Sequence, residues 1–76
     1  HDCSIGNFVH LAPGSILCGN VTVAEGALVG AGAVVLPGRK IGCWATVGAG
    51  AVVTRDVPDF ATLAGNPGRM VNPTAP

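Results

Sequence analysis

The sequence has little charge and very few aromatic residues. Charged side chains make up 11% of its 76 residues, aromatic side chains make up 4%, and the formal net charge is zero. Because nucleic-acid binding requires clustered Lys and Arg, the 4 basic residues argue against a nucleic-acid partner. The richest apolar stretch, GALVGAGAVVLPG, is shorter than the roughly 20 residues that span a bilayer, so we expect no membrane partner.

The cysteines show no metal-binding spacing. Cys3, Cys18 and Cys43 are the only cysteines, and no two of them form a CxxC pair. A structural zinc site is therefore not expected, and we predict no bound metal. Unpaired thiols are typical of a reducing compartment, so the sequence indicates a cytoplasmic protein.

What the chain does contain is a six-residue repeat. Every sixth residue in the first three quarters of the chain is aliphatic: Ile5, Leu11, Leu17, Val23, Val29, Val35, Ile41, Val47 and Val53. The segment VGAGAVV occurs twice, at residues 29–35 and 47–53, so the second copy begins three repeats after the first. A period of six fits a short strand plus a sharp turn, and three such units close a triangle. Three repeats then make one coil of a parallel β-helix.

We therefore predict an all-β fold, a left-handed parallel β-helix of about three triangular coils over residues 1–58. The left hand is typical of hexapeptide triangles and does not follow from the period alone. Residues 59–76 are predicted to form a carboxyl-terminal loop and tail because they are rich in Gly, Asn and Pro. The core is thin and its end coils are open, so we expect the unit to need partners of its own kind.

The repeat stacks candidate site residues at one corner of the triangle. His1, Gly19, Pro37 and Arg55 follow one another at intervals of one full coil. Asp2 beside His1 can support an imidazole as general base, although two solvated terminal side chains fit the same pattern. Gly19 is either a simple turn glycine or a place where a backbone N–H meets a developing oxyanion. Arg55 would suit an anionic group of a long ligand lying along the corner.

Three other residues stand out by position. His10 follows His1 by half a coil, so the two imidazoles should lie on opposite sides of the prism. Either they meet between subunits of a threefold assembly, or His10 is an ordinary surface histidine. Arg69 in the tail could contact a phosphate, or it is an ordinary solvated arginine. Trp44 falls at a turn and should be exposed or at a subunit contact.

The segments HDCSIGNFVHLAPGSILCGN, IGCWATVGAGAVVTRDVPD and LAGNPGRM resemble the hexapeptide-repeat acetyltransferases that modify sialic acid and bacillosamine-type sugars. The resemblance runs over nearly the whole chain. It implies a homotrimer with acetyl-CoA in the groove between two subunits. It also implies that His1 is the general base and that Asp2 orients it. The residue His10 would lie near the acetyl group, and the Gly19 N–H would face the thioester carbonyl.

The chain departs from this family at two points. The amino-terminal α/β domain that holds the nucleotide-linked sugar in the family is absent from this chain, so we expect the chain to be the carboxyl-terminal part of a longer protein. Arg39 stands in an inward column where small or apolar residues are usual. Since an unpaired buried charge costs several kcal/mol, we expect its guanidinium to remain outside the prism.

The leading hypothesis is an acetyl-CoA-dependent acetyltransferase domain acting on an amino or hydroxyl group of a sugar, in particular a nucleotide-linked one. Transfer would be direct, because Cys3 lies in an inward column and is a poor nucleophile. A γ-type carbonic anhydrase on the same fold needs three histidines around zinc, and this chain has 2. A non-catalytic trimerising module is the remaining alternative, which a test of acetyl-CoA binding would separate from the first.

Overall fold

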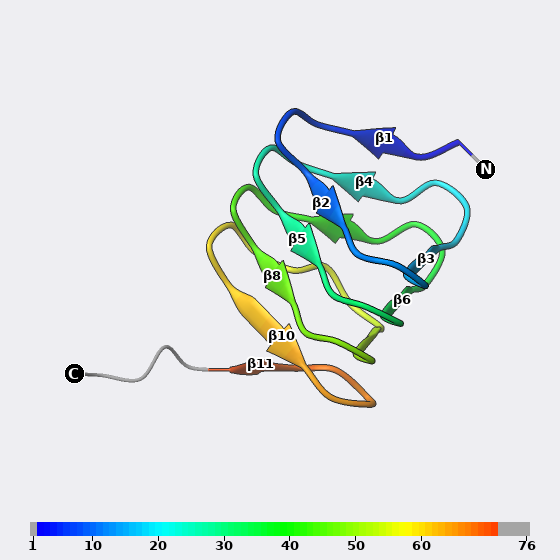
Figure 1. Ribbon diagram of the computed structural model, residues 1–76, viewed down its shortest axis with the longest axis vertical. Coiled ribbons are helices and arrows are strands. Elements are labelled where there is room, and N and C mark those ends of the chain that lie inside the picture. The colour runs from blue at the N-terminus through cyan, green and yellow to red at the C-terminus, as the bar shows by residue number, and fades with distance from the viewer. Residues whose placement is uncertain (1, 72–76) are drawn as a thin grey trace.

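The computed structural model describes residues 2–71, which wind into a triangular prism (Figure 1). Nine strands of two residues each form three complete coils. They are β1 (Ser4–Ile5), β2 (His10–Leu11), β3 (Ile16–Leu17), β4 (Thr22–Val23), β5 (Leu28–Val29), β6 (Val34–Val35), β7 (Lys40–Ile41), β8 (Thr46–Val47) and β9 (Val52–Val53). Two longer strands follow, β10 (Thr62–Ala64) and β11 (Arg69–Val71). The predicted left-handed parallel β-helix is confirmed.

Each side of the triangle is built from parallel strands of successive coils, and β11 adds one antiparallel strand to the edge of one side. One side has the order β1-β4-β7, the second has β11-β10-β8-β5-β2, and the third has β3-β6-β9. We call these sheets A, B and C. Ser4 pairs with Thr22, and Thr22 pairs with Lys40, so each step within sheet A covers one coil of three repeats. The repeat of VGAGAVV therefore builds the same corner and side twice.

The interior is filled by two small or aliphatic side chains from each side of the triangle. The buried residues are Val21, Val23, Ala27, Val29, Ala33, Val35, Ile41, Ala45, Val47, Ala51, Val53, Val57 and Leu63. Ile5 and Leu11 also point inward but remain 45% and 40% exposed, because they belong to the first described coil. Core burial is therefore concentrated in the second coil and beyond, and the first coil has an open end.

The chain after Pro58 differs from the predicted loop. Val57 forms a parallel bridge with Ile41, and Leu63 pairs with Val47. In both pairs the two residues are separated by two positions fewer than a full coil contains. The corner between Val53 and Val57 is shorter by those two residues, which shifts every later position out of the six-residue count. The ladder nevertheless continues into β10, and β11 turns back to pair antiparallel with β10.

Two carboxylates complete this shortened coil. The Lys40 N–H donates to Oδ1 of Asp56 at 2.9 Å, and the Cys43 N–H donates to Oδ1 of Asp59 at 2.8 Å. In the regular coils, a backbone carbonyl of the next coil accepts the bond equivalent to that of Lys40, as Ala27 does for His10. The Asp56 carboxylate thus replaces a backbone acceptor where the coil is short, and the Asp59 carboxylate supplies a further acceptor, so both exposed N–H groups are satisfied.

Arg39 follows the expectation from sequence. Its Nε donates to the Pro37 carbonyl oxygen at 3.3 Å in an exposed position, and the described residues include no buried polar or charged residue. The guanidinium therefore folds over the corner, and the prism interior stays apolar. This arrangement removes the cost of burying an unpaired charge.

The close stacking of coils gives a stability test with a matched control. A Cβ added at Gly30 would lie 2.5 Å from the Ala49 nitrogen and 2.7 Å from the Gly48 carbonyl carbon. A Cβ at Gly48, one coil further along the same corner, would make an ordinary 3.5 Å contact with the Ala64 Cβ. We expect Gly30→Ala to lower the free energy of unfolding by about 1–3 kcal/mol in urea denaturation, and Gly48→Ala to change it by less than about 1 kcal/mol. Equal losses in both variants would contradict the observed coil spacing.

Candidate active site

The predicted corner lies where sheet C passes into sheet A. Gly19, Pro37 and Arg55 occupy it in successive coils, on the chain between β3 and β4, between β6 and β7, and after β9. The Gly38 N–H donates to the Gly19 carbonyl oxygen at 2.9 Å, which ties the first two coils together at this corner. The structure therefore brings together the described members of the column expected from sequence. His1, the proposed base, lies outside the described residues.

Gly19 presents open space on its outer side. A Cβ built on it would meet nothing within 4 Å, and its backbone is not in the left-handed region that favours glycine. Neither local conformation nor coil packing thus requires glycine at this position. The backbone here is open to the outside, which fits the close approach of a ligand to it.

The peptide that leads into Gly19 is held from inside the prism. The Cys3 thiol donates to the Cys18 carbonyl oxygen, with 3.2 Å between sulfur and oxygen. Cys3 is half-buried and packs against the hydrophobic core. The sequence placed Cys3 in an inward column, but this bond joins Cys3 to a residue of a different column. The six-residue repeat gives no signal for this hydrogen bond.

Charged groups flank the corner at both ends. Asp2 is exposed before β1, and Arg55 is exposed where the shortened coil turns. Gly19 and Arg55 are two coils apart, which is roughly 10 Å at the ordinary strand spacing. A ligand several times longer than an acetyl group is needed to contact both.

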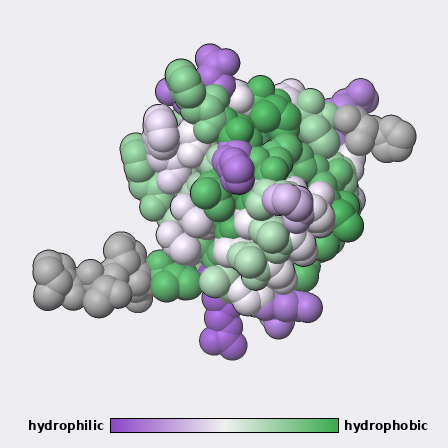
Figure 2. Space-filling model, viewed as in Figure 1, coloured by the Kyte–Doolittle hydropathy of each residue, from purple (hydrophilic) through white to green (hydrophobic). Residues whose placement is uncertain are grey.

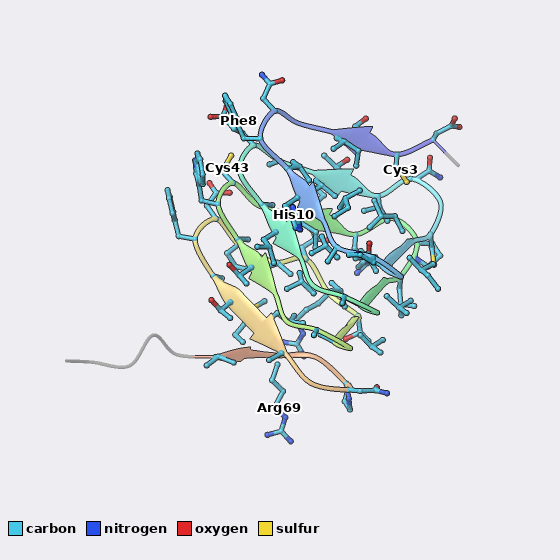
Figure 3. The ribbon with its side chains drawn as sticks, in the orientation of Figure 1. Cys3, Phe8, His10, Cys43 and Arg69 are labelled. Atoms are coloured by element: carbon cyan, nitrogen blue, oxygen red, sulfur yellow. The ribbon has the colours of Figure 1, made fainter. Side chains whose placement is uncertain are left out.

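His10 lies on a different part of the prism. It begins β2, its side chain is exposed, and its column on sheet B continues with Leu28 and Thr46. Sheet B is the side opposite the corner between sheets C and A, so one chain does not bring His10 and Gly19 together (Figure 3). The outward position predicted for His10 is confirmed.

Arg69 is also separate from the corner in a single chain. It begins β11, which pairs with β10 through Arg69 and Ala64. In sheet B, β11 and β2 form opposite ends, so Arg69 and His10 lie four strand steps apart, roughly 19 Å. Figure 3 shows Arg69 pointing away from the coils at the carboxyl-terminal end of the prism.

All three aromatic residues gather at the corner between sheets A and B. Phe8, Trp44 and Phe60 occupy equivalent turn positions with φ of 61°, 56° and 62°. Phe8 is 80% exposed, Trp44 52% and Phe60 75%, so the exposure predicted for Trp44 is confirmed. The Trp44 ring lies over Gly26, where an added Cβ would overlap it. The aromatic residues are thus away from the Gly19 corner.

The outer faces of the three sheets differ in polarity. Sheet A presents Ser4, Thr22 and Lys40 at its outward positions, whereas sheet C presents Ile16, Val34 and Val52. Ile16 is 54% exposed and both valines are partly exposed, and aliphatic outer surface of this kind is typical of a subunit contact. Apolar side chains also cover much of the face seen in Figure 2, on which strands of sheet B lie in front.

The described part of the chain contains neither a membrane-spanning helix nor a metal-binding cluster. Within residues 2–71, no helix has the length and apolar character needed to cross a bilayer. In the same part of the chain, no three His, Cys, Asp or Glu residues cluster closely enough to hold a metal ion. All three thiols are free.

A triangular prism of hexapeptide coils defines a class, the left-handed β-helix proteins, and comparison with known families agrees. The family model described as bacterial transferase hexapeptide (six repeats) matches residues 2–37. The chain belongs to this hexapeptide-repeat family, which confirms the resemblance seen in the sequence.

Individual relatives include sugar N-acetyltransferases. The dTDP-3-amino-3,6-dideoxy-alpha-D-galactopyranose 3-N-acetyltransferase of Aneurinibacillus thermoaerophilus is 52% identical over 52 residues, covering 68% of this chain and 27% of the relative. PerB from Caulobacter crescentus, solved with CoA and GDP-perosamine, has a TM-score of 0.93 and 47% identity over 95% of this chain and 35% of its own.

The acetyltransferase domain of PglB from Neisseria gonorrhoeae, solved with acetyl coenzyme A, has a TM-score of 0.91. It is 42% identical and is matched over 93% of this chain and 35% of its own. The present chain therefore spans about a third, or less, of the length of these relatives.

Proposed function

We propose that this chain is the acetyl-CoA-dependent domain of an acetyltransferase that acts on an amino or hydroxyl group of a sugar. The observation that carries the proposal is the open backbone at Gly19, in a corner where the fold does not require glycine. The relatives support it, since PerB was solved with CoA and GDP-perosamine and the PglB domain with acetyl coenzyme A. By analogy with them, we propose that the acceptor sugar is nucleotide-linked.

The proposed reaction is a direct transfer. His1 removes a proton from the amino or hydroxyl group of the acceptor, and the lone pair of that acceptor group attacks the thioester carbonyl carbon. Asp2 orients the imidazole of His1. The backbone N–H of Gly19 donates to the thioester oxygen, on which negative charge develops. The carbon–sulfur bond then breaks, the CoA thiolate leaves, and the proton held by His1 passes to it. No cysteine is acylated, because Cys3 lies half-buried against the core.

The site requires two chains, and we propose a homotrimer with acetyl-CoA between neighbouring subunits. In a parallel assembly, the corner with Gly19 and Arg55 of one subunit faces sheet B of the next, with its His10 and Arg69. Both sets run in the same direction, from the first coil to the last. The acetyl end would then lie between Gly19 and His10, and the phosphates would lie toward Arg55 and Arg69. Free thiols favour a reducing compartment, so we propose the cytosol.

The proposed assembly predicts a defined mass in solution. Because sheet C exposes an aliphatic outer face and the first coil is open, we expect the protein to associate. Multi-angle light scattering should give a mass of three copies that does not change on moderate dilution. A stable monomer in this measurement would rule out a site shared between subunits.

The second test concerns the proposed proton transfer. In the full-length protein, His1→Ala should lower kcat by roughly 10²- to 10⁴-fold with the KM for acetyl-CoA nearly unchanged, since only proton transfer is lost. Asp2→Asn should have a smaller effect because Asp2 orients the base. Arg55→Ala should do the opposite of His1→Ala, raising the KM for acetyl-CoA with little change in kcat. Steady-state kinetics on the three variants decide this, and a His1→Ala variant with full kcat would place the active site elsewhere.

The third test uses the open space at Gly19. Gly19→Ala should leave the melting temperature unchanged, since its Cβ would meet nothing within 4 Å. We expect it to weaken acetyl-CoA binding at least about tenfold, because the methyl group occupies the space through which the thioester approaches. Gly48→Ala, whose Cβ is also accommodated, is the matched control and should bind like the parent protein.

Titration calorimetry with acetyl-CoA provides the measurement. Equal affinities for Gly19→Ala and Gly48→Ala would contradict the proposed site. A parent protein that does not bind acetyl-CoA would favour the alternative, a trimerising module without catalytic activity.

A further inference from the structure

The corner with Gly19 is built differently from the other two corners of the prism. At six turns, the carbonyl before the turn accepts the N–H of the third residue after it, at 3.1–3.3 Å. These pairs are Ala12 with Ser15, Ala24 with Ala27, Gly30 with Ala33, Gly42 with Ala45, Gly48 with Ala51, and Pro58 with Ala61. All six lie between sheets A and B or between sheets B and C. The equivalent carbonyl of Cys18, between sheets C and A, accepts the Cys3 thiol.

The geometry of the peptide unit makes this bond relevant to Gly19. The Cys18 carbonyl and the Gly19 N–H belong to one planar trans peptide, so they point in opposite directions. Rotation of that peptide moves both groups together. A donor that holds the carbonyl from inside the prism therefore fixes the direction in which the N–H points on the outside.

We propose that Cys3 is a positioning residue, whose thiol aims the Gly19 N–H at the thioester oxygen. This inference rests on the proposed function, since it concerns the same acetyl-transfer site. Cys3 does not contact the ligand in this proposal and does not change its own bonds during the reaction. It acts through the Cys18–Gly19 peptide alone.

The position of Cys3 suits this role. Its place in the interior is taken one coil later by Val21, which is fully buried and has no side-chain donor. A thiol is nearly as compact and apolar as the side chains around it, yet it can donate one weak hydrogen bond. Half-buried against the core, Cys3 has a restricted set of positions, so its bond can orient the peptide.

The size of the effect follows from the oxyanion contact that it supports. Complete removal of one such donor costs roughly 10²- to 10³-fold in kcat. Loss of the thiol leaves the Gly19 N–H in place but less well aimed, so we expect Cys3→Ala to lower kcat by about 3- to 10-fold. The KM for acetyl-CoA should change by less than about twofold, because the ligand contacts remain.

The experiment compares three variants of the full-length protein. Cys3→Ala removes the donor, Cys3→Ser replaces it with a hydroxyl, and Cys43→Ala is the control. Cys43 is also a free, half-buried thiol, but it lies at the corner between sheets A and B. We expect Cys3→Ser to recover at least half of the parent kcat, and Cys43→Ala to equal the parent.

A spectroscopic measurement distinguishes a change in the orientation of the Gly19 N–H from a general loss of structure. Infrared difference spectra of acetyl-CoA labelled with carbon-13 at its carbonyl report the polarisation of the bound thioester. We expect the thioester carbonyl band of acetyl-CoA to lie at lower frequency in the complex with the parent protein than in water. In the complex with Cys3→Ala, the band should shift part of the way back toward its frequency in water. Melting curves establish that the variants are folded.

The outcomes separate this inference from the proposed function. A Cys3→Ala variant with the parent's kcat and carbonyl frequency would overturn the positioning role and leave the acetyltransferase proposal standing. Equal impairment of Cys3→Ala and Cys3→Ser, accompanied by loss of acetyl-CoA binding, would also overturn it, since that is the signature of damaged packing. A parent protein that neither binds nor uses acetyl-CoA would overturn both proposals.

Discussion

The rest of this structure depends on one interaction, the stacking of aliphatic side chains inside the prism. On each side of the triangle, an aliphatic side chain packs onto its counterpart one coil later. Val29 and Val47 pair across sheet B, and Val35 and Val53 pair across sheet C, with all four buried. The nine strands of the regular coils have only two residues each, so no sheet here has the length to stabilise itself. Coil-to-coil burial supplies the stability and also sets the register. Residues one full coil apart in sequence are thereby placed one strand spacing apart at the surface.

This register explains which features could be derived from the sequence. The fold class, the corner shared by Gly19, Pro37 and Arg55, and the outward position of His10 all follow from counting in sixes. The count fails where the coil between Ile41 and Val57 is two residues short, so the repeat does not extend to β10, and the Gly, Asn and Pro content of residues 59–76 predicts a loop there instead. Shortening is possible because the carboxylates of Asp56 and Asp59 accept bonds from backbone donors of the previous coil. The six-residue period does not predict that side-chain carboxylates accept these backbone hydrogen bonds.

A triangular cross-section also constrains how a site can be assembled. A corner and the side opposite to it are separated by the whole width of the prism, so one chain has no means of bringing Gly19 and His10 to the same ligand. The fold instead offers long edges along which residues of successive coils line up. Two prisms side by side place an edge of one against a face of the other. The acetyl-CoA of the proposed function would suit that geometry, because its thioester and its phosphates are separated along an extended molecule, and Gly19 and Arg55 lie on different coils of one edge.

In the proposed function, the Gly19 corner has to satisfy two opposed requirements. A backbone N–H that stabilises developing charge must be rigid, yet the outer surface around it must be empty enough to admit a thioester. Packing from outside would give rigidity and block the approach. The structure separates these demands, since nothing lies within 4 Å of a Cβ at Gly19, and the Cys3 thiol holds the preceding carbonyl from inside. Rigidity then comes from the core side of the peptide and access from the solvent side. At six turns of the other two corners a backbone N–H holds the equivalent carbonyl, whereas at the Gly19 corner the interior contributes a side-chain donor, the Cys3 thiol.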